Sequence, residues 1–221
     1  ALEDPITRVE LSGGMSGSGL PLVPGSALHM RAARRWVSFE DKDMSVAVAL
    51  QDAPLIQLGG IALPYAPFPP TMGEPEPATV YSWVYNNIWD TNFPSQQGFE
   101  MNFRYSVGAA KTSGSGSGPA LGARVAVGQS RKLRAAMATG GTNKLFAEDS
   151  LFSIDDKRVR VIGLTSPRSG EILLRLQSFA EEKITLKLRV NSKLSQPVLA
   201  TVLGEEVKQL KLDNAVVEVP I

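Results

Sequence analysis

Residues Tyr81–Phe93 (YSWVYNNIWDTNF) and Phe99–Tyr105 (FEMNFRY) carry more information about this chain than any other stretch. Two of the three tryptophans lie in the first segment, together with two tyrosines and three asparagines. Aromatic faces stack on sugar rings, and amides hydrogen-bond hydroxyl groups, so this mixture suits carbohydrate recognition. Aromatic side chains also anchor the cores of β-sandwiches. The segment therefore has a binding interpretation and a structural one.

Short runs of alternating apolar residues on either side of this segment predict β-strands. The clearest is Ile184–Val190, in which every second side chain is apolar and lies on one face. Similar segments are Val46–Leu50, Met101–Val107, Ile172–Leu176, Val198–Leu203 and Ala215–Val219. Regular short strands with turn residues between them predict an all-β fold of antiparallel sandwiches. We expect residues 1–140 to form part of a large antiparallel β-sandwich and residues 141–221 a smaller one, with the boundary near Gly140–Phe152.

Other segments do not fit a strand pattern. The Gly/Ser runs Ser12–Gly19 and Ser113–Gly118 predict flexible coil, as surface loops or as a linker. The proline-rich stretch Leu63–Pro77 cannot form a central strand or a helix interior, so it predicts an extended surface excursion. Helical signal is thin, and only Ser26–Arg35 and Gln129–Ala138 are candidates for a turn or two.

Several of these elements, taken in order, resemble the C-terminal β-region of glycoside hydrolase family 38, the α-mannosidases. The segment Asp52–Gly60 (DAPLIQLGG) is similar to an Asp-Ala-Pro-Leu element of that family. Tyr81–Phe93, which we call the aromatic–amide segment, follows it as in the family. The likeness runs from about Pro24 to near the C-terminus. It departs from the family at Thr165, where a lysine is usual, and in the run Gln177-Ser178, where an asparagine is frequent. Further similar elements are Pro24–Ser26, Arg35–Val37, Val159–Leu164 and Glu171–Leu176.

The resemblance implies a supersandwich-like portion followed by an immunoglobulin-like sandwich. It implies a noncatalytic region that serves hydrolysis of α-mannosidic bonds by a catalytic domain absent from this chain. That domain would hold the zinc ion and would be the partner of this region, with a mannose-containing glycan as a second partner. Two other interpretations remain open, a free-standing carbohydrate-binding module and a structural or adhesion domain.

The chain by itself is poor in catalytic residues. It has one histidine, His29, and no cysteine, and no zinc-ligand spacing surrounds that histidine. It contains no nucleophile elbow and no phosphate-binding or dinucleotide-binding loop. Paired carboxylates are the one catalytic route left, and Asp52, Asp90 and Glu100 are the candidates. Their simpler interpretation is as turn and loop residues. We therefore expect no catalytic residue, metal site or cofactor in this chain.

The candidate contact residues lie in the aromatic–amide segment. In the binding interpretation they form a loop at the rim of the catalytic cleft of a full-length enzyme, or they pack on its catalytic domain. In the structural interpretation the aromatic side chains are buried and the asparagines satisfy loop backbone groups. The five candidates for sugar or domain contact are Asn86, Asn87, Trp89, Asp90 and Asn92.

The composition of the chain limits the classes of partner that it can bind. The net charge is +1, which gives no electrostatic basis for binding nucleic acid or an anionic membrane. No run of 18 apolar residues occurs, so the sequence predicts no membrane-spanning segment. The absence of cysteine excludes disulfides but leaves the compartment open between the cytoplasm and the periplasm or exterior.

Overall fold

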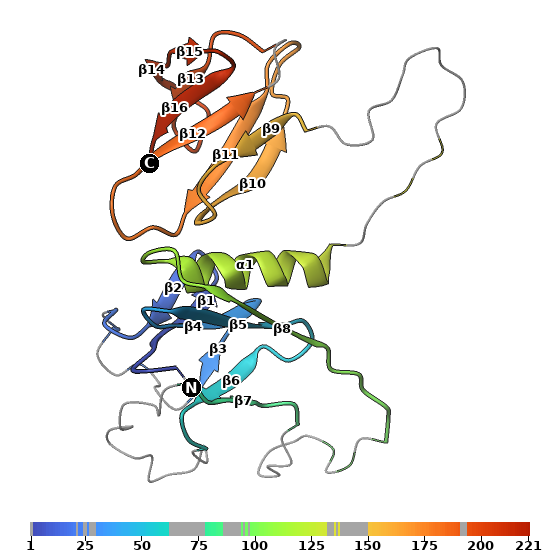
Figure 1. Ribbon diagram of the computed structural model, residues 1–221. Helices are drawn as coiled ribbons and strands as arrows, with labels where there is room; N and C mark the ends of the chain where they lie inside the picture. Colours follow the sequence, from blue (N-terminus) through green and yellow to red (C-terminus); the bar gives the residue numbers. More distant parts are fainter. Residues whose placement is uncertain are drawn as a thin grey trace. The chain divides into compact units, whose positions relative to one another are not determined.

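The computed structural model describes residues 2–20, 22–23, 26, 30–61, 78–85, 94, 96, 98–131, 135, 137, 150–190 and 194–221. Its elements divide into two units, Ala1–Lys132 and Leu133–Ile221, which are described separately. Strands make up most of the ordered structure, with one helix in the described residues. The prediction of an all-β fold with antiparallel sheets is confirmed (Figure 1).

A five-stranded antiparallel sheet is the centre of the first unit. Its strand order is β2-β1-β4-β5-β8. A tight turn joins the first two strands, and Gly13 adopts a φ of 91° there, which a side chain would disfavour. Asp41 makes the next turn, because its Oδ1 accepts the backbone N–H groups of Asp43 and Met44 at 2.9 and 2.7 Å. The strands are β1 (Ile6–Leu11), β2 (Gly14–Gly17), β4 (Trp36–Glu40), β5 (Met44–Leu50) and β8 (Tyr105–Lys111).

A smaller sheet covers part of one face of this sheet. Its order is β3-β6-β7, with β3 (Arg31–Ala32), β6 (Leu55–Leu58) and β7 (Val80–Ser82). The two layers enclose a core of buried apolar side chains, which is why alternate residues of β4 and β6 are apolar. The fully buried members of this core are Val9, Ala33, Val37, Phe39, Leu50, Ile56 and Leu58.

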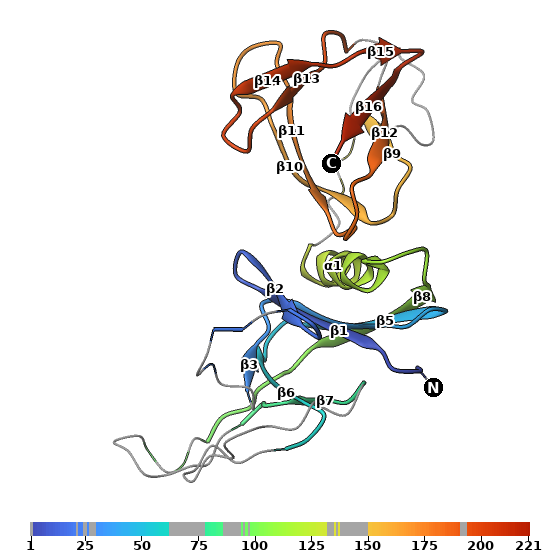
Figure 2. The same cartoon turned by 90° about the vertical axis from the view of Figure 1, so that its left-hand side faces the viewer.

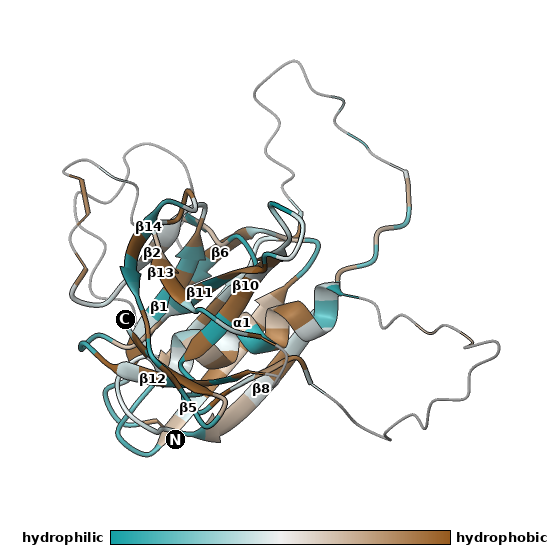
Figure 3. Ribbon diagram, turned by 90° about the horizontal axis from the view of Figure 1, so that it is seen from above, coloured by the Kyte–Doolittle hydropathy of each residue, from teal (hydrophilic) through white to brown (hydrophobic). Residues whose placement is uncertain are grey.

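The helix α1 (Ser117–Ser130) lies along the opposite face of the five-stranded sheet, so the first unit has three layers (Figures 1 and 2). Its close approach depends on glycine. A Cβ atom on Gly122 would lie 2.6 Å from Cδ2 and Cε3 of the Trp36 indole, and one on Gly108 of β8 would lie 2.6 Å from Val125 Cγ2. Apolar residues predominate along the helix (Figure 3). Its polar residues are Ser117, Arg124, Gln129 and Ser130.

A buried carboxylate stabilises the start of this helix. Glu40, at the end of β4, is only 7% exposed, and its Oε2 accepts the backbone N–H of Gly118. The first N–H groups of a helix have no partner within the helix and carry partial positive charge, so an anion is favourable there. The sequence in the first turn supplies no acidic residue, and Glu40 fills this role from the sheet.

The second unit is a β-sandwich. A four-stranded sheet of order β15-β16-β12-β9 faces the β10–β11 and β13–β14 pairs, and side chains from both groups share one core (Figure 2). The buried members are Val159 from β10 and, from the larger sheet, Leu186, Leu188, Val217 and Val219. The strands are β9 (Phe152–Ile154), β10 (Val159–Thr165), β11 (Leu173–Ser178), β12 (Thr185–Val190), β13 (Val198–Ala200), β14 (Glu206–Gln209), β15 (Leu212–Asp213) and β16 (Val216–Pro220).

An ion-pair cluster holds the turn that precedes β10. The side chain of Arg158 is 11% exposed, and it binds the Asp156 carboxylate at 2.8 Å and also pairs with Glu182. Hydrogen bonds from Arg158 hold the pKa of Asp156 below its usual value. The carboxylate is therefore fixed in its ionised form at neutral pH.

Some local predictions were wrong. The Gly/Ser runs are not coil throughout, because Ser12–Gly19 contains strand β2 and the last two residues of Ser113–Gly118 begin α1. The helix candidate Ser26–Arg35 contains strand β3 instead, and α1 ends at Ser130, near the start of the other candidate. The predicted strand at Met101–Val107 begins only at Tyr105. Packing against Trp36 and Glu40 explains the helix, which its glycine content disfavours.

Two other predictions fall mostly on residues that the structure does not describe. They are the proline-rich excursion and the boundary near residue 140. Within the described part of the chain, no helix has the length and apolar character that a membrane span requires.

Candidate functional site

The candidate site lies where the chain leaves the five-stranded sheet and returns to it. Leu50 ends β5 and pairs directly with Tyr105, the first residue of β8. Residues 51–104 therefore form one long excursion, with both of its ends at this single point of the sheet. The excursion includes β6, β7 and the whole aromatic–amide segment. We call its closing point, residues 50–52 and 104–105, the neck.

An ion pair with fork geometry closes the neck. Arg104 donates from Nη2 to Asp52 Oδ1 at 2.7 Å and from Nε to Asp52 Oδ2 at 3.0 Å. The backbone N–H of Arg104 donates to the same Oδ2 at 2.8 Å, and Gln51 donates its N–H to the Arg104 carbonyl at 3.2 Å. Bidentate arginine–carboxylate pairs fix both distance and orientation. The neck is thus held by side chains in addition to the β5–β8 ladder.

The ion pair with Arg104 also affects the protonation of the Asp52 carboxyl group. The Arg104 guanidinium holds the pKa of Asp52 below its usual value. A general acid in a glycosidase needs the opposite shift, a carboxyl group that keeps its proton at neutral pH. Of the other two carboxylates considered, Glu100 is exposed and Asp90 lies outside the described residues. Asp52 is therefore unsuited to act as a general acid, and both of its carboxylate oxygens accept hydrogen bonds from Arg104.

Four exposed aromatic side chains lie on the excursion and at its closing point. Tyr81 and Tyr85 are 38% and 53% exposed, Phe99 is 59% exposed and Tyr105, which belongs to the neck, is 40% exposed. Tyr105 is tied to β7, because its hydroxyl shares a hydrogen bond of 2.8 Å with Ser82 Oγ. Large exposed aromatic surfaces can stack on a sugar ring or pack on another protein surface. We call these four residues the aromatic rim.

The five residues predicted for sugar or domain contact lie outside the described part of the chain. They are Asn86, Asn87, Trp89, Asp90 and Asn92, and the structure therefore does not test them. The described residues on either side of them, Tyr85 and Phe99, belong to the aromatic rim. His29 is also outside the described residues. Sequence reasoning missed the Asp52–Arg104 pair, although both residues lie within the elements that carry the family resemblance.

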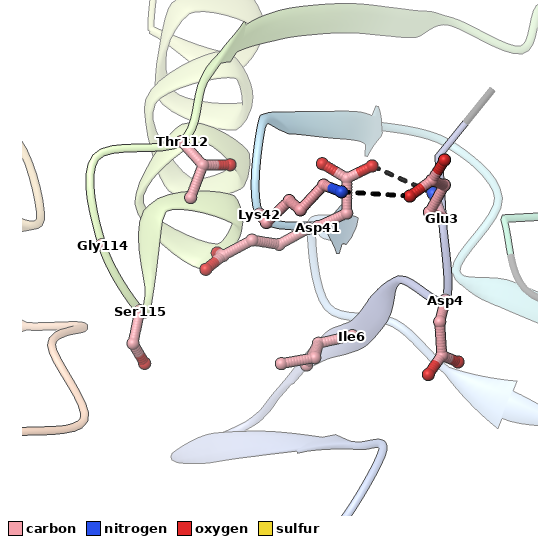
Figure 4. A pocket seen from close by; sticks show the side chains of 9 residues that line it. Glu3, Asp4, Ile6, Asp41, Lys42, Thr112, Gly114 and Ser115 are labelled. Atoms are coloured by element: carbon pink, nitrogen blue, oxygen red, sulfur yellow. Dashed lines mark hydrogen bonds and ion pairs between the residues drawn. The ribbon is translucent and has the colours of Figure 1, made fainter.

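A second polar site lies at the N-terminal end of the same unit. It is an open hollow of about 590 Å³, between the start of β1, the β4–β5 turn and the loop before α1 (Figure 4). Lys42 Nζ contacts Glu3 Oε2 at 3.2 Å, and Glu3 donates its backbone N–H to Asp41 Oδ2 at 3.0 Å. Backbone hydrogen bonds, foremost that of Met44, hold the pKa of Asp41 below its usual value. These carboxylates are occupied in holding turns.

Metal binding finds no support in this geometry. The described residues contain no group of three or more histidine, cysteine, aspartate or glutamate side chains placed to hold a metal ion.

Comparison with known proteins adds no further identification. No protein-family model, no curated protein and no solved structure matches this chain.

Proposed function

We propose that this chain is the noncatalytic C-terminal β-region of an α-mannosidase-like glycoside hydrolase. In this proposal it serves the hydrolysis of α-mannosidic bonds by a catalytic domain that lies elsewhere in the enzyme. The observation that carries the proposal is the neck. Asp52 and Arg104 both lie within Arg35–Tyr105, where the resemblance to the family is strongest, and their side chains bind each other.

The chemistry of the described residues supports a noncatalytic role. The carboxylate at the neck is ionised and tied to arginine, and the described residues provide no metal-ligand cluster. The neck anchors a long excursion through the Asp52–Arg104 pair, and this excursion and its closing point carry the exposed aromatic rim. Such a surface orders a neighbouring domain or contributes to the edge of a sugar-binding cleft.

The decisive experiment compares this chain with the complete protein that its gene encodes. Each is assayed for release of the aryl group from an aryl α-mannoside. We expect turnover by the complete protein, loss of turnover when zinc is chelated, and none by residues 1–221 alone. A complete protein without α-mannosidase activity contradicts the proposal, and so does turnover by the isolated chain.

Contact by the aromatic–amide segment is tested by substitution in the complete protein. Trp89→Ala and Asn87→Ala should lower kcat/KM about 10-fold or more while thermal unfolding stays unchanged, because a lost contact weakens transition-state binding and not the fold. Asn102→Ala is the matched control, since Asn102 is an exposed amide of the same excursion. Unchanged turnover in both test variants contradicts a contact role.

The aromatic rim favours one other function, that of a carbohydrate-binding module. Tyr81 and Tyr85 are exposed enough to stack on pyranose rings. Calorimetric titration of residues 1–221 with mannose oligosaccharides tests this directly. Binding that Tyr85→Ala abolishes would favour the module, and absence of binding would exclude it.

A further inference from the structure

One face of the five-stranded sheet is only partly covered. Val48 of β5 pairs with Val107 of β8, and Leu50 pairs with Tyr105. Directly paired residues project to the same face, and Val37 of β4, which pairs with Val48, belongs to the core between the two sheets. Val107 and Tyr105 therefore lie on the face that the smaller sheet covers, opposite the face that carries α1.

Exposure rises sharply across this face towards β8. Val37 and Leu50 are 0% and 4% exposed, whereas Tyr105 and Val107 are 40% and 70% exposed. Met44, which lies on this face at the other end of β5, is 39% exposed. The covering strands β3, β6 and β7 have two, four and three residues, and β5 and β8 have seven each. We call Met44, Tyr105 and Val107 the open face.

Among the described residues β7 is an edge strand of the smaller sheet, and it lies at the border of the open face. β7 is the last strand in the order β3-β6-β7, and β8 is the last strand in the order β2-β1-β4-β5-β8. Ser82, at the end of β7, hydrogen-bonds to the Tyr105 hydroxyl at 2.8 Å, so this end of β7 lies over the start of β8. A strand added to β7 would therefore continue the smaller sheet across the open face.

We propose that β7 and the open face together bind an antiparallel β-strand from another part of the complete enzyme. The strand would pair with β7 through its backbone and cover Tyr105 and Val107 with apolar side chains at alternate positions. An acidic residue at its far end would meet Lys111, which pairs with Met44 and is exposed. The source of the strand rests on the function proposed above, whereas the binding surface does not.

Edge pairing alone does not satisfy this surface. A strand that pairs with β8 extends the five-stranded sheet sideways, and the Val107 side chain remains in water because it projects from the face. Only a strand in the layer of β7 both removes an unpaired sheet edge and buries the apolar side chains beside it. One added strand in the layer of β7 would therefore both pair with the edge of β7 and cover the open face.

The test compares Val107→Lys in residues 1–221 and in the complete protein. Val207→Lys is the matched control, because Val207 is a 62% exposed valine on β14 of the other unit. In the isolated chain we expect no change in thermal unfolding for either variant, since both side chains are in water. In the complete protein Val107→Lys should lower the unfolding temperature, and Val207→Lys should not.

Amide hydrogen exchange supplies the second readout. Exchange at the β7 and β8 amides should be about 10-fold or more slower in the complete protein than in residues 1–221, because the added strand protects them. Equal exchange in the two proteins, a neutral Val107→Lys variant, or a gene that encodes no residues beyond this chain would overturn the proposal. So would a dimer of residues 1–221 that Val107→Lys dissociates, because a second copy would then occupy the surface.

The two proposals fail separately. A complete protein that shows the Val107→Lys effect without hydrolysing α-mannosides keeps the strand-binding surface and removes the proposed function. A complete protein that hydrolyses α-mannosides and tolerates Val107→Lys does the reverse.

Discussion

Gly122 of α1 lies directly against the indole ring of Trp36 in β4, and a Cβ atom at position 122 would come within 2.6 Å of that ring. Gly118, one turn earlier, has the same relationship with Glu40, whose Cβ would be 3.1 Å from a Cβ at position 118. The helix therefore contacts the sheet closely where Gly118 and Gly122, which have no side chain, face it. Gly118 and Gly122, two of the three glycines that weaken the helix as an isolated segment, let it dock on the sheet.

Gly122→Ala should destabilise the first unit. The added methyl group overlaps the Trp36 ring, and overpacking of this kind costs about 1–3 kcal/mol, partly offset by the better helix propensity of alanine. Chemical denaturation followed by tryptophan fluorescence measures the change. All three tryptophans, Trp36, Trp83 and Trp89, lie in the first unit, so the signal reports that unit.

Gly128→Ala is the control for this prediction. A Cβ atom there has no neighbour within 4 Å, so the substitution should stabilise the helix by about 0.5–1 kcal/mol. Equal effects of the two substitutions would contradict the docking argument.

Glu40→Gln should weaken the start of α1. Glutamine keeps the shape of the side chain but removes the negative charge that faces the helix N-terminus, at a cost of about 1 kcal/mol. Urea unfolding of the variant measures the loss. Asp43→Asn, in the exposed β4–β5 turn, removes a charge without touching the helix and should be nearly neutral. The argument fails when both variants lose the same stability.

Asp52→Ala should loosen the neck. The backbone N–H of Arg104 donates to Asp52 Oδ2, so its amide exchange should accelerate about 10-fold or more in the variant. Amide exchange measured by NMR follows this one residue. Asp43→Ala should leave the exchange of Arg104 unchanged, and an unchanged rate in Asp52→Ala itself would show that the carboxylate does not hold the neck.

The stability of the second unit should fall at acidic pH because of Asp156. Its pKa in the folded chain is lowered from the ordinary value of 3.8, chiefly by the Arg158 hydrogen bond. The ionised carboxylate therefore stabilises the fold fully above about pH 4, and this contribution is lost as the pH falls through the lower folded value. Asp156→Asn should cost about 1 kcal/mol at neutral pH, and this cost should shrink as the pH falls through the lowered folded pKa.

Methyl NMR signals of the second-unit core follow this unfolding, because that unit contains no tryptophan. Asp213→Asn, an exposed aspartate on β15, serves as the control. A constant difference between wild type and Asp156→Asn from pH 7 to pH 2 would contradict the assignment.

The strands were predictable where one face of the sheet is buried. The alternation in Ile184–Val190 gave β12 to within one residue, and Leu186 and Leu188 are buried as the pattern requires. The sequence did not predict α1, because SGPALGARVAVGQS has three glycines and no amphipathic pattern. Its helical state depends on Trp36 and Glu40, about 80 residues away in the chain. Local propensity carries no such information.

The sequence did not predict the Asp52–Arg104 pair. Asp52 reads locally as a turn residue and Arg104 as part of an alternating strand, and nothing in the spacing between them indicates a bond. The sequence also left open whether the aromatic side chains of the aromatic–amide segment are exposed or buried. The contact residues Asn86, Asn87, Trp89, Asp90 and Asn92 stay a prediction.

The neck has a consequence for how this protein can change over evolutionary time. Because the excursion starts and finishes at adjoining positions of β5 and β8, its length can vary without shifting the register of either strand. Insertions in the excursion that leave the buried residues of β6 in place therefore keep the pairing of β5 with β8 unchanged, so this point of the scaffold can display segments of different length.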